Sequence, residues 1–172
     1  MRRALVFALL LPGLAFAQKP ARVSAMPIDD VSVKPGGSVP ITMQFRVAPG
    51  YHINSNRPKS ELLIPTVVSL SVPTNVSVAG INYPAAEDLT FPFSPDEKLS
   101  VYTGDFAVTA KVIAAKAISK GTYRVHGMLR YQACDNRACY PPTTIPLTFD
   151  VKVAKASAPG KRTPGQSPHA HR

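Results

Sequence analysis

Proline recurs along almost the whole of this chain, with 18 prolines among 172 residues, which is about twice the usual share. A proline inside a helix costs about 3 kcal/mol or more, because it removes a backbone hydrogen bond and clashes with the preceding turn. Long helices are therefore not expected. The length suits one domain with tails, and such a domain is large enough to bury a hydrophobic core without a dense set of disulfides.

Five segments alternate apolar and polar side chains with the period of two that marks a half-buried strand. They are residues 39–47, 64–72, 106–112, 123–131 and 145–153, and weaker runs lie at 28–33, 51–54 and 76–83. Turn-forming sequences such as KPGG at 34–37 separate them. Residues 111–120 are expected to be a strand end and a loop. Seven or eight strands, each with one apolar and one polar face, predict an all-β fold, an antiparallel β-sandwich.

The two ends of the chain differ from this domain. Residues 1–17 carry Arg2, Arg3, an apolar stretch and an A-x-A site, which are the features of a secretory signal peptide cleaved after Ala17. The apolar stretch is shorter than the roughly 20 residues that span a bilayer, so no membrane span is expected after cleavage. Residues 155–172 are rich in Pro, Gly, Ser and basic residues and are expected to be a disordered basic tail. The folded domain is thus predicted at 18–154.

The formal net charge of +10 lies largely in these ends. Two of the 20 basic residues belong to the signal peptide and four to the tail, so residues 18–154 hold 14 basic and 10 acidic residues. This balance is ordinary for a folded domain and does not favour nucleic-acid binding. The four histidines show no metal-ligand spacing with a carboxylate or thiol, so neither a metal nor a cofactor is expected.

Residues 84–101 interrupt the alternation. Between Pro84 and Val101 the run AAEDLTFPFSPDEKLS holds two phenylalanines, two prolines and four acids. A connection of this length without secondary structure is usually functional or disordered, and the phenylalanines argue against disorder. The alternative interpretation is a surface loop with a tucked aromatic plug.

The two cysteines of the chain, Cys134 and Cys139, have four residues between them and stand between one predicted strand and the Pro-Pro that precedes the next. In phase, Cys134 continues the polar row that ends with Arg130 and Gln132, so it is expected to point away from the sandwich core. An exported chain meets an oxidising compartment, where a hairpin could join the two sulfurs.

Such a bridge has two interpretations. Closing so short a ring stabilises a fold by roughly 2 kcal/mol, which makes the bridge a modest staple. An accessible bridge suits thiol–disulfide exchange, for which Arg137 favours a thiolate and Asp135 opposes it. The residues alone leave open a redox pair and a structural disulfide in a non-catalytic binding domain, with a metal chaperone as a more distant third class.

Four blocks carry a resemblance to a known family: GYHINSNRP at 50–58, IPT at 64–66, VYTG at 101–104 and GTYRVHGMLRYQACDNRACYPP at 121–142. In this order they resemble the N-terminal periplasmic domain of the thiol:disulfide interchange protein DsbD, over nearly all of residues 24–153. The resemblance implies an immunoglobulin-like sandwich in the periplasm whose cysteine pair shuttles electrons. It also implies thioredoxin-fold partners, such as disulfide isomerases and cytochrome c maturation thioredoxins.

The resemblance further implies roles for single residues. Cys139 would form the mixed disulfide with the partner, and Cys134 would resolve it. A cap loop that shields the disulfide would correspond to residues 91–99, and the residues expected there are Phe91, Phe93, Asp96, Glu97 and Leu99, with Phe93 or Leu99 as the lid. Tyr102 and Tyr140 are expected as supporting contacts or as ordinary packing.

The family's membrane domain and thioredoxin-like domain have no counterpart in this sequence, and its cysteine ring has four intervening residues rather than five. The resemblance therefore implies a stand-alone version of the domain. Its reductant is expected to be a separate membrane electron carrier.

Overall fold

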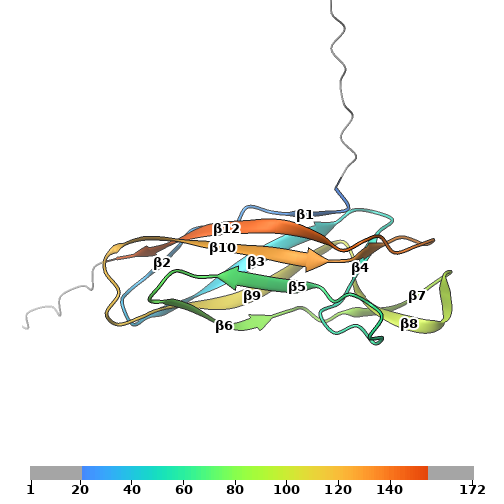
Figure 1. Cartoon of the computed structure of the whole chain (residues 1–172), viewed down its shortest axis with the longest axis horizontal. Helices are drawn as coiled ribbons and strands as arrows, with labels where there is room; N and C mark the ends of the chain where they lie inside the picture. Colours follow the sequence, from blue (N-terminus) through green and yellow to red (C-terminus); the bar gives the residue numbers. More distant parts are fainter. Residues whose placement is uncertain (1–20, 155–172) are drawn as a thin grey trace, which may run out of the picture.

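The computed structural model describes residues 21–154. The predicted signal peptide at 1–17 and the predicted basic tail at 155–172 lie outside the described residues, so these predictions and the cleavage after Ala17 stay untested. The described chain forms twelve strands and no helix (Figure 1). Within residues 21–154, accordingly, no helix is long and apolar enough to cross a membrane.

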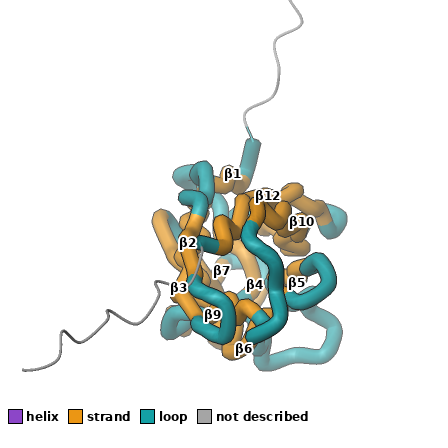
Figure 2. The backbone as a smooth tube through the Cα atoms, turned by 90° about the vertical axis from the view of Figure 1, so that its left-hand side faces the viewer, coloured by secondary structure: helices purple, strands orange, loops and turns teal. Residues whose placement is uncertain are grey.

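Two four-stranded sheets form the body of the molecule. The first has the order β1 (Val23–Ala25), β3 (Ser38–Val47), β9 (Asp105–Ala114) and β6 (Val76–Asn82). The second has the order β2 (Val31–Val33), β12 (Thr143–Val153), β10 (Gly121–Tyr131) and β5 (Val67–Ser71). Among the strands of the described chain, β2 and β12 form the one parallel pair, and the other pairs are antiparallel. Figure 2, seen along the long axis, shows the strands arranged around a common interior.

Strict alternation along the strands builds the core. In β3 the side chains of Ile41, Met43, Phe45 and Val47 are buried, and the residues between them are exposed. Buried residues of β9, β10 and β12 join them in one hydrophobic cluster that spans both sheets. The chain is an immunoglobulin-like β-sandwich, as predicted.

The long predicted strands are confirmed. The runs at 39–47, 106–112, 123–131 and 145–153 lie within β3, β9, β10 and β12, and the run at 64–72 contains the shorter β5. The weaker runs contain β2, β4 (His52–Asn54) and β6. Residues 111–120 are a strand end and a loop, because β9 stops at Ala114. The sequence pattern did not indicate the short β1 or the two-residue β11 (Ala133–Cys134).

A third sheet lies at one end of the sandwich, where Figure 1 shows β4, β7 and β8 gathered at the right-hand side. Its order is β11, β4, β8 (Ser94–Tyr102) and β7 (Glu87–Phe91). The prediction of a connection without secondary structure at 84–101 is therefore wrong. Residues 87–102 form the β7–β8 hairpin, which is stabilised by a small apolar cluster of its own: Phe91, Leu99 and Val101, with Leu63 and Leu89 packed against them.

Candidate functional site

Cys134 and Cys139 form a disulfide at the end of the molecule that carries the third sheet, with their Cα atoms 3.9 Å apart. Strand β11 pairs Cys134 with β4, and the chain then reverses so that the two cysteines also form a backbone bridge. The amide of Asp135 donates to the carbonyl of Ala138 at 3.0 Å, and the amide of Tyr140 donates to the carbonyl of Ala133 at 2.8 Å. Backbone hydrogen bonds on both sides of the disulfide thus close the hairpin.

Cys134 is 0% exposed, and the core cluster of the sandwich includes its neighbour Ala133 but not Cys134. The residue thus lies off the sandwich core, as expected, but it is buried rather than at the surface. Strand β10 ends at Tyr131, and the chain leaves the second sheet through Gln132. The side-chain oxygen of Gln132 accepts hydrogen bonds from Asn54 and from the amide of Ile64, and its nitrogen donates to the carbonyl of Tyr140. Ala133 keeps the core-facing phase of Leu129 and Tyr131, whereas Cys134 is buried outside that core cluster and Cys139 stays partly exposed.

Asp135 organises the four residues inside the ring. One carboxylate oxygen accepts hydrogen bonds from the amides of Arg137 at 2.8 Å and Ala138 at 3.0 Å, and the other accepts one from the hydroxyl of Tyr140 at 2.6 Å. The bond from Tyr140, followed by the two amide bonds, lowers the pKa of Asp135 to about 2. A carboxylate charge is thus fixed next to Cys134 at neutral pH.

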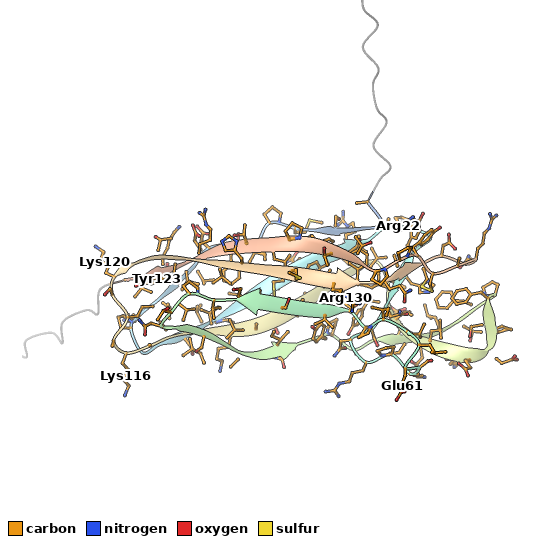
Figure 3. All side chains as sticks on the ribbon, in the orientation of Figure 1. Arg22, Glu61, Lys116, Lys120, Tyr123 and Arg130 are labelled. Carbon is orange, nitrogen blue, oxygen red and sulfur yellow. A yellow bond between two sulfur atoms is a disulfide. The ribbon has the colours of Figure 1, made fainter. Side chains whose placement is uncertain are left out.

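Tyr140 connects this ring to the start of the chain. The Arg22 guanidinium (Figure 3) lies over the Tyr140 ring, with 3.6 Å from its carbon to the ring centroid, and Tyr51 packs nearby with 6.1 Å between ring centroids. The hydrogen bond to Asp135 raises the pKa of the Tyr140 hydroxyl, which therefore remains a donor at neutral pH. Tyr140 thus lies next to the disulfide and contacts Asp135, Arg22 and Tyr51.

His52 is a residue of this site that sequence reasoning missed. It is the residue of β4 directly opposite Cys134, and it is only 2% exposed. Its imidazole stacks on Phe91 with 3.7 Å between centroids, and burial lowers its pKa to about 4, against a smaller opposing effect of the Asp135 charge. The three residues of β4 are all buried, and so short a strand has no alternation from which this could be read. In the sequence, His52 stood out only as part of the GYHINSN block that carries the family resemblance.

The structure brings only part of the predicted cap next to the disulfide strands. Phe91 is buried against His52, and Phe93, which is 37% exposed, lies 6.1 Å from His52 and 5.7 Å from Phe91 between ring centroids. Asp96 and Glu97 are exposed on β8 and make no ion pair within the described chain. Leu99 is buried inside the hairpin cluster.

Tyr102 takes part in the main core rather than in the ring of the disulfide. It stacks on Phe106 with 5.0 Å between centroids, and its hydroxyl donates to the side chain of Asn56 at 2.6 Å. It reaches the site through the backbone, because it pairs with Ile53 of β4, the neighbour of His52.

The chemistry available at this end of the molecule is that of a disulfide beside a buried imidazole. In the described part of the chain, no three His, Cys, Asp or Glu side chains lie close enough to hold a metal ion together. The fold and the site together define a class of protein, an immunoglobulin-like domain with a hairpin disulfide at one end.

The comparison with protein families identifies the family within this class. The family described as "Thiol:disulfide interchange protein DsbD, N-terminal" matches residues 22–150, and the chain belongs to this family. No curated protein matches the chain.

Solved structures similar to the chain include an N-terminal domain of ScsB and two structures that contain a DsbD N-terminal domain. The N-terminal periplasmic domain of ScsB from Proteus mirabilis is 19% identical with a TM-score of 0.49, over 74% of this chain and 45% of that chain. The reduced DsbD N-terminal domain of Neisseria meningitidis is 22% identical with a TM-score of 0.39, over 65% and 75%. A chain in the complex between the DsbD and PilB N-terminal domains of the same organism is 20% identical with a TM-score of 0.44, over 79% and 88%. The present chain thus spans less than half of the ScsB chain.

Proposed function

We propose that this chain is a periplasmic thiol:disulfide exchange protein that relays reducing equivalents to thioredoxin-fold partners through Cys134 and Cys139. The observation that carries the proposal is the unequal exposure of the two cysteines of one hairpin disulfide. Cys134 is fully buried, whereas Cys139 is partly exposed. A partner reaches the exposed cysteine first, so Cys139 is the attacking residue and Cys134 the resolving residue. Membership of the family supports the same chemistry.

The transfer takes two exchange steps. The Cys139 thiolate attacks a disulfide of the partner, which forms a mixed disulfide and releases one partner sulfur as a thiolate. Cys134 then attacks the Cys139 sulfur, which closes the Cys134–Cys139 disulfide and releases the second partner sulfur in reduced form. A separate membrane electron carrier returns the pair to the dithiol. Residues 1–17 direct export to the periplasm and are removed after Ala17.

The β7–β8 hairpin acts as the cap of the disulfide in this proposal. Phe91 anchors the cap by stacking on His52, and Phe93 is the exposed aromatic ring that a docking partner displaces. Leu99 holds the hairpin together from inside, and the exposed Asp96 and Glu97 face a partner. Tyr140 supports the ring through Asp135, and Tyr102 supports β4 from the core.

A trapping experiment tests the exchange role. Cys134→Ser leaves Cys139 without its resolving residue, so a mixed disulfide with an oxidised periplasmic thioredoxin-fold protein should accumulate and be visible on non-reducing gels. Cys139→Ser is the matched control and should trap no partner. If neither variant captures a partner and the reduction potential of the pair lies below about −300 mV, the disulfide is structural and the chain is a non-catalytic binding domain.

A further inference from the structure

The imidazole of His52 has an unsatisfied polar atom. Its Nε2 is buried and has no hydrogen-bond partner in the described structure. A buried polar atom without a partner costs about 1–3 kcal/mol, so such an atom in a folded protein calls for an explanation. The residues that surround it give one.

His52 faces the disulfide across a strand pair. His52 and Cys134 are directly opposite each other in the antiparallel pairing of β4 with β11. Side chains of directly opposed residues lie on the same face of the sheet, with Cβ atoms about 4.5–5.5 Å apart. Both residues are buried, so their side chains are shielded from bulk solvent. An imidazole is thus held within reach of the sulfur that must act as the resolving nucleophile.

Cys134 needs a proton acceptor in this environment. Burial and the ionised Asp135 next to it both disfavour a thiolate at this position. The groups that pack on His52 from the cap, Phe91 and Phe93, carry no titratable group, and Asp135 is the charge that acts on the ring. Burial outweighs this charge and lowers the pKa of His52 to about 4, so His52 is neutral at neutral pH, and a neutral imidazole has one nitrogen free to accept a proton.

We propose that His52 accepts the thiol proton of Cys134 as Cys134 resolves the mixed disulfide. The inference rests on the proposed exchange function and adds a proton acceptor to it. The Cys134 sulfur forms the bond to Cys139, the bond between Cys139 and the partner sulfur breaks, and the electron pair leaves with that sulfur as a thiolate. The proton of Cys134 moves to the imidazole and from there to the released thiolate or to water. In the reverse direction the imidazole takes the proton of the attacking partner thiol, or one from water, and passes it to Cys134 as that sulfur leaves.

The phases of a colorimetric reaction separate the two cysteines. Reduced protein mixed with dithiobis-nitrobenzoate releases one coloured thiolate when Cys139 attacks and a second when Cys134 resolves the adduct. His52→Phe keeps a ring to stack on Phe91 but removes the nitrogens. We expect it to slow the second phase at neutral pH by about 100-fold, the lower limit of the usual effect of a general base. The first phase should keep its rate, which also shows that the variant is folded.

The dependence of this second phase on pH distinguishes a proton acceptor from a packing residue. In the His52→Phe variant the second phase should recover as pH rises and hydroxide replaces the missing base. His126→Phe, on the exposed face of β10, is the matched control and should leave both phases unchanged. An unchanged second phase in His52→Phe, or equal slowing of both phases at every pH, overturns the proposal.

A measurement on the unsubstituted protein covers the case in which His52→Phe does not fold. The ring resonances of His52 in the reduced protein should show an inflection at the pH where Cys134 ionises, and Cys134→Ser should abolish it. Resonances that do not respond to Cys134 overturn the role of His52. Both experiments use the isolated chain, so they fail independently of the partner trap. A trapped partner without coupling leaves the exchange function standing and removes only His52.

Discussion

The hydroxyl of Tyr140 donates a 2.6 Å hydrogen bond to the carboxylate of Asp135, so the residue after Cys139 is joined to the residue after Cys134. Two links between side chains therefore cross the same hairpin, the disulfide and this hydrogen bond. The hydrogen bond does not depend on the sulfur atoms, so it can keep the ring ordered whether the cysteines are joined or reduced.

Tyr140→Phe should raise the pKa of Asp135 from about 2 toward 3.8, because the bond from Tyr140 is the largest cause of the low value. The folded pKa lies below the unfolded one, so the carboxylate stabilises the fold above pH 4 or so and this contribution is lost as pH falls toward 2. Carboxyl titration by NMR and unfolding curves across this range measure both effects. Tyr123→Phe is the control, because the hydroxyl that it removes donates a hydrogen bond to the carbonyl of Ser119, away from Asp135. An unchanged Asp135 pKa would contradict the role given to Tyr140.

Burial of His52 should make stability depend on pH between about 4 and 6.5. Its pKa is lower in the folded than in the unfolded state, so the unfolded chain binds the proton more tightly in this window. The contribution of His52 to the free energy of unfolding is fully present above pH 6.5. It falls by on the order of 2–3 kcal/mol as pH drops to 4. Denaturant unfolding of the oxidised protein at several pH values should show this slope, and His52→Phe should flatten it. A slope that persists in the variant assigns it to another group.

Removal of the exposed cap ring should open the disulfide to small reductants. We expect Phe93→Ala to speed reduction by dithiothreitol at least about twofold, because reduction requires access to a sulfur. The fold should lose little stability, since Phe93 is already 37% exposed. Leu62→Ala removes an apolar side chain that is 90% exposed in the segment before β5, and it should leave the reduction rate unchanged. Equal rates in the Phe93 variant and the parent would show that Phe93 is not part of the cap.

Gly127 allows β10 and β5 to approach each other closely. A Cβ atom there would lie 2.6 Å from both the Ser69 carbonyl oxygen and a Leu70 methyl group. Gly127→Ala should therefore cost about 1–3 kcal/mol, as overpacking does elsewhere. Gly121→Ala in the same strand meets only the Tyr123 ring at 3.6 Å and should change stability by less than about 0.5 kcal/mol. Thermal or denaturant unfolding compares the two, and equal stabilities would show that the strands can separate without cost.

The body of the fold was predictable because each long strand carries its own signal. In β3 the alternation that ends at Phe45 and Val47 is visible in the sequence and reappears as burial. Where a strand spans only two or three residues, its period cannot be recognised, and its burial depends on the sheet that it joins. Strand β4 and strand β11 are of this kind, and together they hold His52 and Cys134.

The burial of Cys134 was missed for the same reason. The phase of β10 predicts that Cys134 lies off the sandwich core, but it does not show that the chain passes through Gln132 into a third sheet where this residue is buried. Similarly, the β7–β8 hairpin alternates poorly because it stands at the end of the molecule and buries few residues. The cysteine pair itself was predictable from its spacing, whereas the buried partner of Cys134 required the register of β4.

The two ends of the described chain leave the sandwich in different places. Arg22 packs on Tyr140 beside the disulfide. Ala154 follows β12, and its amide donates a hydrogen bond to the carbonyl of Val33. Figure 3 places Arg22 toward the end of the molecule opposite Lys116 and Lys120. Attachment to a sensor surface or a fluorescent carrier through the C-terminal side thus presents the disulfide to solution. Attachment just before Arg22 places the carrier beside Tyr140 and the disulfide, so it should be avoided in any binding assay built on this domain.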